Sequence, residues 1–471
     1  MDATQEADCI ASLVARLGAG ADSEAARDAA RALMSVTSVA TDADRNEVAL
    51  RDAGGIAPLV ALLGAGVDSQ AAGFAAGALM NASINDTNAE AICAAGGIAP
   101  LVALLQAGAD SVAATYAAGA LANLAFHASS AEAIRAAGGI APLVALLGAG
   151  ADSEAASYAV NALMNLAAST ICAEAIREAG GIAPLVALLG AGAELVVACD
   201  AAAALWNLAR DAAGAASIRE AGGIAPLVAW SLGPGADSEA SGDAAGALTS
   251  LADDATNADA ILEGVALLGG VSGAAIGFHS HRLHRLLICK LCRISQQRLA
   301  AAEAGDNVPT LERAIRHGSA LDFPPLHEAI RSARERLAEL RDEAALRARR
   351  ETLGLGELPL PHEFKCPITY ARMKDPVVAS DGHSYERSAI VRVLAARHPR
   401  SPLTREPLEQ TLFANRNLKK RIEQHEKEVL NAAEQSVAVH VAEVHSKRGA
   451  EAGASSSSEP PAKRTRGRGQ L

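Results

Sequence analysis

The sequence predicts a mainly α-helical protein, in which a superhelical solenoid is followed by a helical connector and a small α+β domain. An internal repeat in the N-terminal half and a segment with turn signals near the C-terminus carry this prediction. Composition agrees, because half of the residues are hydrophobic but only 3% are aromatic. Small aliphatic side chains such as alanine and valine suit thin interfaces between packed helices.

The repeat is defined by the string Ala-Gly-Gly-Ile-Ala-Pro-Leu-Val-Ala. It begins at Ala53, Ala95, Ala137, Ala179 and Ala221, each 42 residues after the last. Around the fourth copy, the pattern predicts a short helix over 173–178, a second helix over 182–189 and a long third helix over 198–209. The Gly-Gly pair ends the first helix, because glycine accepts the left-handed backbone that a sharp bend requires.

This pattern resembles armadillo repeats. We expect six of them over residues 9–263, after an N-terminal tail at 1–8, and the resemblance implies a right-handed superhelix with a concave groove. The first repeat starts near Cys9 and is divergent, as terminal repeats often are. The others start near Gly54, Gly96, Gly138, Gly180 and Gly222.

Asparagines recur on the third helices with the same step, at Asn81, Asn123, Asn165 and Asn207. In armadillo proteins an asparagine here often lines the concave groove, where its amide binds the backbone of an extended peptide, so the resemblance implies a substrate groove. Alternatively, each asparagine caps a helix or bridges neighbouring repeats. Import receptors also carry a tryptophan one turn earlier. Its positions here are Gly77, Gly119, Asn161 and Ala203, which disfavours that function.

Charge separates the two halves of the chain. Residues 1–263 contain 9 Arg, no Lys and 30 Asp plus Glu, a net charge of −21, whereas the rest of the chain carries +9. An acidic solenoid favours a basic protein substrate and disfavours nucleic-acid binding by the repeats. A solvated acidic surface without a dedicated partner is the alternative.

A helical connector is expected next, as a cap over 264–305 and a hairpin over 306–356 broken at Phe323-Pro-Pro325. The cap contains Cys289-Lys-Leu-Cys292, a spacing that can bind zinc, but interleaved leucines favour a buried helix without metal. The second arm of the hairpin has an apolar stripe, which predicts packing against the solenoid or self-association. The stripe consists of Leu326, Ile330, Leu337, Leu340 and Leu346.

The small α+β domain is predicted over 358–432. Asp381-Gly382 favours a tight turn between two short strands. Ser388 is a candidate N-cap for a helix over 389–397, whose apolar face is Ile390, Val393 and Leu394. A second helix is expected from Arg416, with Leu418, Ile422 and Val429 facing inward.

Three stretches in this domain resemble the U-box, the zinc-free relative of the RING domain in ubiquitin ligases. They are Phe364-Lys-Cys-Pro-Ile-Thr-Tyr370, Asp381-Gly-His-Ser-Tyr-Glu-Arg387 and Ser401-Pro-Leu-Thr-Arg405. A RING holds two zinc ions with eight Cys or His ligands. Cys366 and a few histidines such as His383 and His398 precede the second helix, far fewer than eight ligands, so we expect neither metal nor cofactor.

The resemblance implies that this domain binds a ubiquitin-conjugating enzyme through two loops and the first helix. The implied contacts are Ile368, Tyr370, Val393, Pro402 and Leu403. Arg405 lies where U-box and RING ligases often carry a cation that bridges the conjugating enzyme and its attached ubiquitin. The ligase itself would supply no covalent nucleophile, because its contribution is to position the ubiquitin tail.

The whole chain resembles plant U-box/armadillo ligases, with the two parts in reverse order. The expected function is ubiquitin ligation: the groove binds a protein substrate, and a substrate lysine attacks the ubiquitin thioester. Two departures from the U-box pattern are Val393, where tryptophan is usual, and Ser401, where cysteine is usual. The alternative is a non-catalytic armadillo adaptor whose U-box is a structural remnant.

The C-terminal residues 445–471 are predicted to be a disordered basic tail. Lys463-Arg-Thr-Arg-Gly-Arg468, together with Lys447-Arg448, resembles a bipartite nuclear import signal, although basic clusters also bind acidic surfaces in general. The seven cysteines form no disulfide framework, and the sequence shows neither a signal peptide nor a membrane span. We therefore expect the protein in the cytoplasm and, through the tail, in the nucleus.

Overall fold

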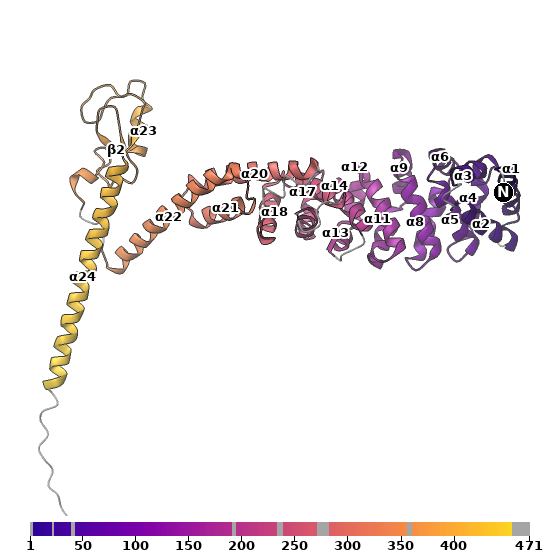
Figure 1. Ribbon diagram of the computed structural model, residues 1–471, viewed down its shortest axis with the longest axis horizontal. Helices are drawn as coiled ribbons and strands as arrows, with labels where there is room; N and C mark the ends of the chain where they lie inside the picture. Colours follow the sequence, from indigo (N-terminus) through magenta and orange to yellow (C-terminus); the bar gives the residue numbers. More distant parts are fainter. Residues whose placement is uncertain are drawn as a thin grey trace, which may run out of the picture. The chain divides into compact units, whose positions relative to one another are not determined.

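The computed structural model describes residues 3–20, 23–38, 43–190, 195–232, 239–270, 282–355 and 360–454. The basic cluster that begins at Lys463 therefore lies outside the described residues, as does the predicted start of the small domain at Leu358. The chain divides into two compact units, Met1–Arg336 and Leu337–Leu471. Each unit is mainly helical (Figure 1).

Unit 1 is a stack of helices in the order of the chain. Its repeat helices are α1 (Ala3–Leu17), α2 (Glu24–Thr37), α3 (Ala43–Asp52), α4 (Ile56–Leu63), α5 (Gln70–Ala82), α6 (Asp86–Ala94), α7 (Ile98–Leu104), α8 (Val112–Leu124), α9 (Ala128–Ala136), α10 (Ile140–Leu146), α11 (Glu154–Ala167), α12 (Thr170–Glu178), α13 (Ile182–Gly190), α14 (Leu195–Leu208), α15 (Ala212–Glu220), α16 (Ile224–Leu232), α17 (Glu239–Leu251) and α18 (Ala255–Leu267). The 3₁₀ turns η1 (Leu105–Ala107) and η2 (Leu147–Ala149) follow α7 and α10. Then come α20 (Arg282–Glu303) and α21 (Val308–Ala320).

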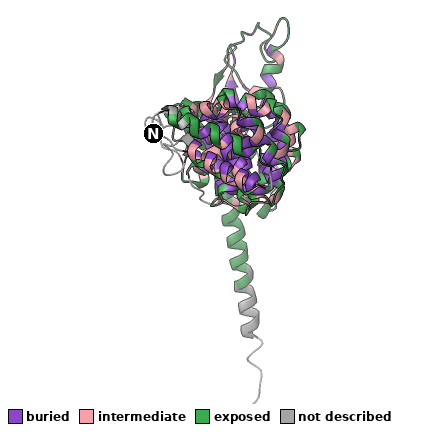
Figure 2. Cartoon of the chain, turned by 90° about the vertical axis from the view of Figure 1, so that its right-hand side faces the viewer, coloured by how far each residue is buried: buried purple, intermediate pink, exposed green. Residues whose placement is uncertain are grey.

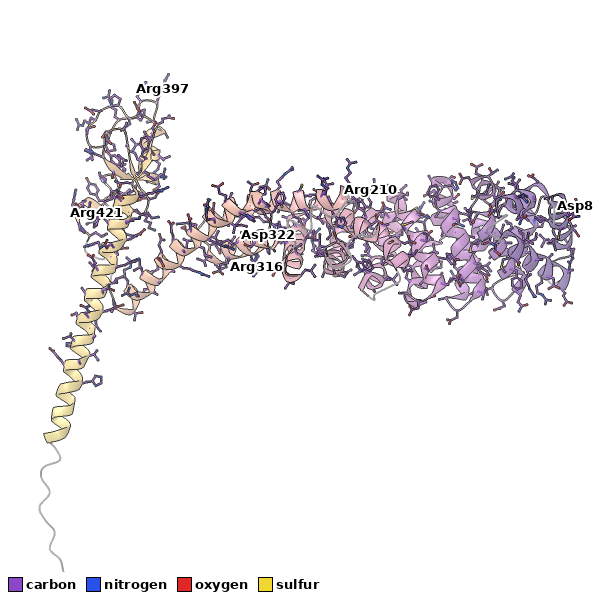
Figure 3. All side chains as sticks on the ribbon, in the orientation of Figure 1. Asp8, Arg210, Arg316, Asp322, Arg397 and Arg421 are labelled. Carbon is purple, nitrogen blue, oxygen red and sulfur yellow. The ribbon has the colours of Figure 1, made fainter. Side chains whose placement is uncertain are left out.

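The third helices of the repeats form a continuous row. Helices α2, α5, α8, α11, α14 and α17 each pack against the next, and α20 packs on α17 at the end of the row. Buried residues lie between these helices (Figure 2). Charged side chains such as Asp8 and Arg210 point outward (Figure 3). The core is built mostly from alanine, leucine, isoleucine and valine, which agrees with the scarcity of aromatic residues.

The Gly-Gly pair has two separate roles in the fourth copy of the repeat. Gly180 has φ +73°, the left-handed backbone that turns the chain from α12 into α13. Gly181 is packed so closely that an added Cβ would lie 2.8 Å from Cγ2 of Ile176 and 3.0 Å from Cγ2 of Val144. The first member therefore permits the bend, and the second permits close packing between repeats.

Helix starts are the main difference from the sequence-based expectation in this repeat. Helix α12 begins at Thr170 rather than near 173, and α14 begins at Leu195 rather than near 198. Serines precede several of these helices. Ser111 and Ser153 accept hydrogen bonds from backbone N–H groups in the first turns of α8 and α11.

The N-terminal tail predicted over 1–8 is also partly helical. Helix α1 begins at Ala3, so residues 3–8 belong to this helix.

The connector begins as part of unit 1. Helix α21 packs on α18 and α20, and it is followed by a turn in which Asp322 has φ +36°. Helix α22 (Pro324–Thr352) comes next, and its first apolar residues, Leu326 and Ile330, are buried. Gly318 of α21 lies close to Ile330. Leu326 and Ile330 thus pack against the helices at the end of the solenoid, which is one of the two roles predicted for the apolar stripe. The other role, self-association, stays a prediction.

No cluster of His, Cys, Asp or Glu suited to a metal ion occurs among the described residues. Cys292 is buried in α20, and burial, followed by the neighbouring Cys289, raises the pKa of its thiol to about 11. Among the described helices none is long and apolar enough to cross a membrane by itself, whereas the pairs Asp86–Ala94 with Ile98–Ala107 and Ala128–Ala136 with Ile140–Ala149 pass the same test as bent pairs.

Unit 2 contains a three-stranded antiparallel sheet in the order β2-β1-β3. Its elements are the turn η3 (His362–Phe364), β1 (Pro376–Val378), β2 (Ser384–Glu386), α23 (Arg387–Leu394), β3 (Phe413–Ala414) and α24 (Arg416–Ala454). Val377 of β1 pairs with Tyr385 on one side and with Ala414 on the other. Gly382, with φ +79°, makes the predicted turn between β1 and β2.

Helix α23 starts earlier and ends earlier than expected. Its N-cap is Glu386, not Ser388, and it ends at Leu394 rather than at 397. The earlier start follows from Glu386, whose carboxylate accepts hydrogen bonds from the N–H groups of Lys374 and Asp375 and so holds the end of β2 against the preceding loop. Ile390 and Leu394 are buried as predicted, and Val393 is half-buried.

Helix α24 begins at Arg416, as predicted, and runs to Ala454, well past the expected domain end at 432. Residues 445–454 are therefore helical rather than part of a disordered tail. Asn415 caps it by accepting a hydrogen bond from the Leu418 N–H at 3.0 Å. Ile422 and Leu430 are buried, whereas Val429 is only half-buried. Leu430 therefore replaces Val429 as the apolar anchor of this turn.

The last part of α22 packs on α24 inside unit 2. Arg349 binds Glu434 at 2.7 Å, and Lys419 binds Glu339 at 3.3 Å. The buried carboxylate of Glu426 accepts from Arg372 at 2.7 Å. The C-terminal part of α22 therefore packs as part of the small domain. This packing was not predicted from the sequence.

Candidate functional site

Two loops of unit 2 share one five-residue design. They are Cys366-Pro-Ile-Thr-Tyr370 and Ser401-Pro-Leu-Thr-Arg405. In each loop the fifth residue donates its backbone N–H to the carbonyl oxygen of the first, at 2.8 Å in the first loop and 3.0 Å in the second. Both fifth residues have left-handed backbones, with φ +56° at Tyr370 and +65° at Arg405. Such a conformation costs a non-glycine residue about 1–2 kcal/mol, so the surrounding contacts must hold it in place.

The side chain of the first residue supports each loop from inside. Ser401 Oγ accepts from the N–H groups of Leu403 at 3.1 Å and Thr404 at 2.9 Å. Cys366 Sγ, fully buried, accepts from the Glu386 N–H at 3.3 Å. Burial opposes ionisation of this thiol, but N–H groups from Glu386 and from its own loop outweigh burial and lower its pKa.

Strand β2 lies between the two loops and contacts both. While Glu386 binds the first loop, the hydroxyl of buried Tyr385 lies 3.4 Å from Ser401 Oγ in the second. The same hydroxyl donates to Asp381 Oδ2 at 2.7 Å. Burial, Asp381 and nearby Cys366 raise the pKa of Tyr385 to about 12. For Asp381, burial is outweighed by hydrogen bonds from Ser401, Tyr385 and His383, which lower its pKa.

The residues predicted to bind a conjugating enzyme differ in exposure. Tyr370 is 72% exposed and Leu403 is 50% exposed, and Pro402 and Arg405 are also exposed. Ile368 is half-buried and packs partly against the domain core. The loops therefore present side chains at the surface on backbones that are fixed from within.

Val393, the predicted contact on the first helix, also packs partly against the core. Its neighbour Val391 is 48% exposed and is the more accessible apolar residue of α23. Val391 was not singled out from the sequence, because the contact on this helix was placed by correspondence with a tryptophan position. The contact at Val393 stays a prediction.

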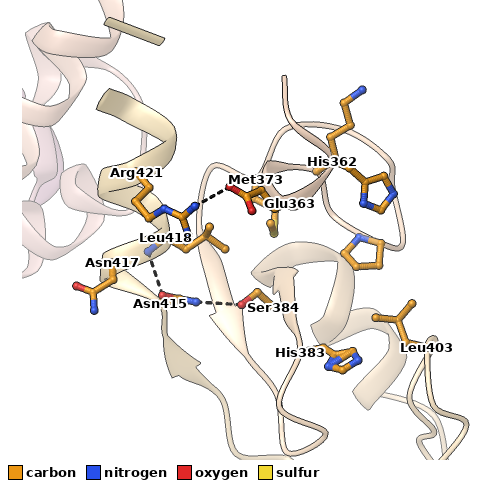
Figure 4. Close-up of a pocket in the computed structure, with 12 residues that line it drawn as sticks. His362, Glu363, Met373, His383, Ser384, Leu403, Asn415, Asn417, Leu418 and Arg421 are labelled. Carbon is orange, nitrogen blue, oxygen red and sulfur yellow. Dashed lines mark hydrogen bonds and ion pairs between the residues drawn. The ribbon is translucent and has the colours of Figure 1, made fainter. Parts of the chain in front are cut away.

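A hollow of about 420 Å³ lies where the two loops, the β1–β2 turn and the start of α24 meet (Figure 4). Pro367 of the first loop and Leu403 of the second both line it, so the structure brings the two loops together. Its wall is held by Arg421, which donates to Glu363 at 2.6 Å, and by Asn415, which donates to Ser384 at 3.0 Å. Both polar and apolar residues line this hollow.

The four repeated asparagines bridge neighbouring repeats. Each side-chain amide donates to a backbone carbonyl of the preceding third helix. The pairs are Asn81 to Met34 at 3.1 Å, Asn123 to Met80 at 3.0 Å, Asn165 to Ala122 at 3.0 Å and Asn207 to Met164 at 3.4 Å. These hydrogen bonds support the alternative in which each asparagine bridges neighbouring repeats. All four residues are half-buried, and a contact with a bound peptide stays a prediction.

The sequence analysis did not single out a row of aromatic residues on the third helices. Phe74, Tyr116 and Tyr158 follow the same 42-residue step, which was the available signal. A Cβ added at Gly77 would lie 3.1 Å from the Tyr116 ring, and one at Gly119 would lie 3.4 Å from the Tyr158 ring. Each tyrosine therefore lies beside a glycine of the preceding third helix, and all three rings are half-exposed.

Comparison with known proteins identifies both parts of the chain. Residues 360–429 match the U-box domain family. Residues 85–126 and 169–210 match the armadillo/beta-catenin-like repeat. The chain therefore carries armadillo repeats followed by a U-box, as the resemblance predicted.

Curated relatives share the U-box segment. WD repeat, SAM and U-box domain-containing protein 1 of Danio rerio is 53% identical over 60 residues, which are 12% of this chain and 12% of that protein. E3 ubiquitin-protein ligase SPL11 of Oryza sativa subsp. japonica is 41% identical over 51 residues, which are 11% of this chain and 7% of that protein. The chain thus spans only about a tenth of the length of these relatives.

A solved structure agrees with the fold. The crystal structure of an engineered protein, 32% identical, superposes with a TM-score of 0.54 and covers 70% of this chain and 78% of that one. The mainly α class and the solenoid are thus supported by both the family match and a structural neighbour.

Proposed function

We propose that this protein is a U-box ubiquitin-protein ligase, a transferase of the RING type. The observation that supports this most is the pair of matched loops, which present Tyr370, Leu403 and Arg405 on fixed backbones. The U-box family match and a relative named as an E3 ubiquitin-protein ligase support the same function. In this proposal the U-box recruits a ubiquitin-charged conjugating enzyme, and the solenoid binds the protein that is modified.

The U-box would act by contact and positioning. In this proposal Ile368, Tyr370, Pro402 and Leu403 would form an apolar surface of the kind that marks a partner site. Arg405 offers several N–H donors in one plane, so it can bind the conjugating enzyme and ubiquitin together. Its left-handed backbone, and the hydrogen bond that its carbonyl accepts from Arg400 at 3.1 Å, fix where the side chain leaves the loop. Holding the thioester in a reactive pose accelerates attack by a substrate lysine.

Substrate binding is assigned to the face of the solenoid formed by the third helices. Half-exposed asparagines and aromatic rings recur there, and the solenoid is strongly acidic. We propose a basic protein substrate on this ground. The basic tail supports a protein that works in both the cytoplasm and the nucleus.

A non-catalytic adaptor is the second candidate. It is favoured by Val393, because valine offers much less contact area than the tryptophan usual at this position. Such a protein would keep the U-box fold and bind partners through the solenoid without recruiting a conjugating enzyme.

Ubiquitination with purified enzymes tests the proposal. The full chain would be assayed with a panel of conjugating enzymes, comparing wild type with Ile368→Ala. Val437→Ala is the matched control, since Val437 is an exposed valine on α24 outside the two loops. Chains formed by wild type and Val437→Ala but lost in Ile368→Ala support the ligase. Absence of chains with every conjugating enzyme, from a folded chain, would leave the adaptor.

A further inference from the structure

Backbone hydrogen bonds close the first loop of the U-box at its base. The Cys366 N–H donates to the Ala371 carbonyl at 2.8 Å. The Met373 N–H donates to the Phe364 carbonyl at 3.1 Å. Arg372 lies between these two bonds, directly after the loop residues predicted to contact a conjugating enzyme. Its side chain therefore leaves the chain at the point where the base of the loop is held.

The Arg372 guanidinium binds a buried carboxylate on α24. Its Nη2 donates to Glu426 Oε2 at 2.7 Å, and Glu426 is only 4% exposed. A buried carboxylate is costly to remove from water unless cations and hydrogen-bond donors surround it. Release of Arg372 would leave this charge without its hydrogen-bonded partner. Glu426 therefore favours the one conformation of the loop base that keeps Arg372 in place.

The other oxygen of Glu426 is paired with the connector. Arg350, near the C-terminal end of α22, lies 3.9 Å from Glu426 Oε1, which is an ion-pair distance but too long for a hydrogen bond. Within the part of the chain that the structure describes, Oε1 and the buried Nε of Arg372 lack hydrogen-bond partners. The triad of Arg350, Glu426 and Arg372 is therefore incompletely satisfied on its connector side.

A hollow of about 180 Å³ lies beside this triad, and all three residues line it. The space lets the Arg350 guanidinium approach or leave Glu426 without displacing a packed side chain. How well Glu426 is paired thus depends on how closely the end of α22 lies against α24. When Arg350 leaves, the desolvation cost of Glu426 rests on Arg372 alone, so opening of the triad to water becomes easier.

We propose that Glu426 is a positioning residue of the ligase, which couples the docking of the connector helix α22 to the first loop. With Arg350 close, Glu426 fixes Arg372 and thereby the base of the loop. Without this support the loop samples more conformations, and ordering it costs affinity for the conjugating enzyme. Arg405 belongs to the second loop and still positions ubiquitin after binding. The effect on catalysis rests on the proposed ligase function, whereas the effect on the loop does not.

Hydrogen exchange of the full chain tests the coupling without any other ubiquitin enzyme. Glu426→Gln keeps the size of the side chain but removes its charge, so residues 366–373 should exchange about tenfold faster. Residues 401–408, in the second loop, should keep their protection. Arg350→Ala should accelerate exchange of 366–373 about threefold, although Arg350 lies on another helix. Arg350→Lys keeps the positive charge and should retain most of the protection.

The neighbouring Arg349 tests whether docking itself acts through Glu426. Its guanidinium donates to Glu434 at 2.7 and 2.8 Å and to Asn431 at 2.9 Å. Arg349→Ala therefore loosens α22 on α24 without removing a contact of Glu426. It should accelerate exchange of 366–373 in the wild-type background but add no further effect in the Glu426→Gln background. Independent effects would add instead.

Arg331→Ala is the matched control on the same helix. Arg331 is exposed, and its ion pair with Glu328 lies within α22 at 3.6 Å. Its removal should change the exchange of 366–373 less than about 1.5-fold. Circular dichroism would show that each variant is folded. If Glu426→Gln unfolds the domain, the half-buried residues Arg350 and Arg349 still carry the test.

Discharge of a ubiquitin-charged conjugating enzyme onto free lysine supplies the second readout. Glu426→Gln should raise the ligase concentration needed for half the maximal rate about tenfold and change the rate at saturation less than about twofold. A lower saturating rate at an unchanged half-maximal concentration would contradict the inference. So would equally faster exchange in both loops, additive effects of Arg349→Ala and Glu426→Gln, or equal effects of Arg350→Ala and Arg331→Ala. The predicted exchange without any discharge by wild type would support the coupling and contradict the ligase function alone.

Discussion

Cys366 and Ser401 occupy equivalent positions in the two loops of the U-box. Each accepts a backbone N–H on its side chain, and each carbonyl accepts the N–H of the residue four positions later. A RING domain would fill such loops with zinc ligands. Here a buried sulfur and a hydroxyl collect backbone hydrogen bonds instead. The replacement of the usual cysteine by Ser401 therefore keeps the acceptor that the loop needs.

Removing the acceptor at residue 401 should loosen the second loop. Ser401→Ala leaves the Leu403 and Thr404 N–H groups without their partner and should cost about 1–3 kcal/mol locally. Ser401→Cys restores the atom type present in the first loop and should cost less. Hydrogen exchange of residues 401–408 in the full chain measures both. Equal protection in Ser401→Ala and wild type would show that the hydroxyl does not support the loop.

Tyr385 should make the U-box sensitive to high pH. Its pKa is about 12 in the folded domain against an ordinary value of 10.0, so the unfolded chain loses this proton first. The stabilisation is therefore present below pH 10 and is lost as pH rises towards 12. Tyr385→Phe should lower stability at neutral pH, through loss of the bond to Asp381, and should remove this part of the pH dependence. Unfolding of both proteins between pH 8 and 12 tests the difference, and parallel curves would contradict it.

Asn123 should stabilise the junction between two repeats. Its amide donates to the Met80 carbonyl at 3.0 Å and to Ser83 Oγ at 3.1 Å. Asn123→Ala should cost about 1–2 kcal/mol at this junction, because two partly buried hydrogen bonds are lost. Asn123→Asp keeps the shape but replaces the donor, so it should lose a similar amount. Hydrogen exchange of α5 and α8 measures the effect. Unchanged exchange of both helices in Asn123→Ala would contradict this role.

Much of the fold was predictable because its signals are local or strictly periodic. The 42-residue step defined the repeats, and the structure confirms the turn predicted at Asp381-Gly382 and the helix start predicted at Arg416. The missed features depend on contacts between distant residues. The N-cap at Glu386 depends on Lys374 and Asp375, and the docking of α22 depends on ion pairs such as Arg349–Glu434.

Among the candidate site residues, too, some could be predicted from local sequence and others depend on contacts between distant residues. The two loops could be found from their resemblance to the U-box, and Cys-Pro-Ile-Thr-Tyr and Ser-Pro-Leu-Thr-Arg share proline and threonine at their second and fourth positions. The exposure of Val391 could not be predicted in this way, because it depends on how α23 is rotated against the core. A hollow of about 290 Å³ on the solenoid, lined by Phe126, Trp206 and Asp243 among others, could not be found either, because only the stacking of helices from four repeats brings these residues together.

Self-modification should be confined to the second unit. Lys290 is the single lysine of residues 1–336, and its amino group binds the Thr249 carbonyl at 2.6 Å and Asp253 at 2.7 Å. We expect ubiquitin on exposed lysines of the U-box unit, such as Lys374 and Lys427. Mass spectrometry of the self-modified chain locates the sites, and Lys290→Arg should leave the total unchanged. Lys290 as the main acceptor would contradict this expectation.

The most direct test of the ligase is discharge of a ubiquitin-charged conjugating enzyme onto free lysine. The full chain should accelerate discharge, and the two loops should contribute differently. Ile368→Ala should weaken binding, so that its rate recovers as the ligase concentration rises. Arg405→Ala should bind the conjugating enzyme but keep a low rate even at saturation, because positioning of ubiquitin is lost. Acceleration by wild type with this separation of effects is the predicted result. A folded wild-type chain that leaves the discharge rate unchanged with every conjugating enzyme would contradict the account.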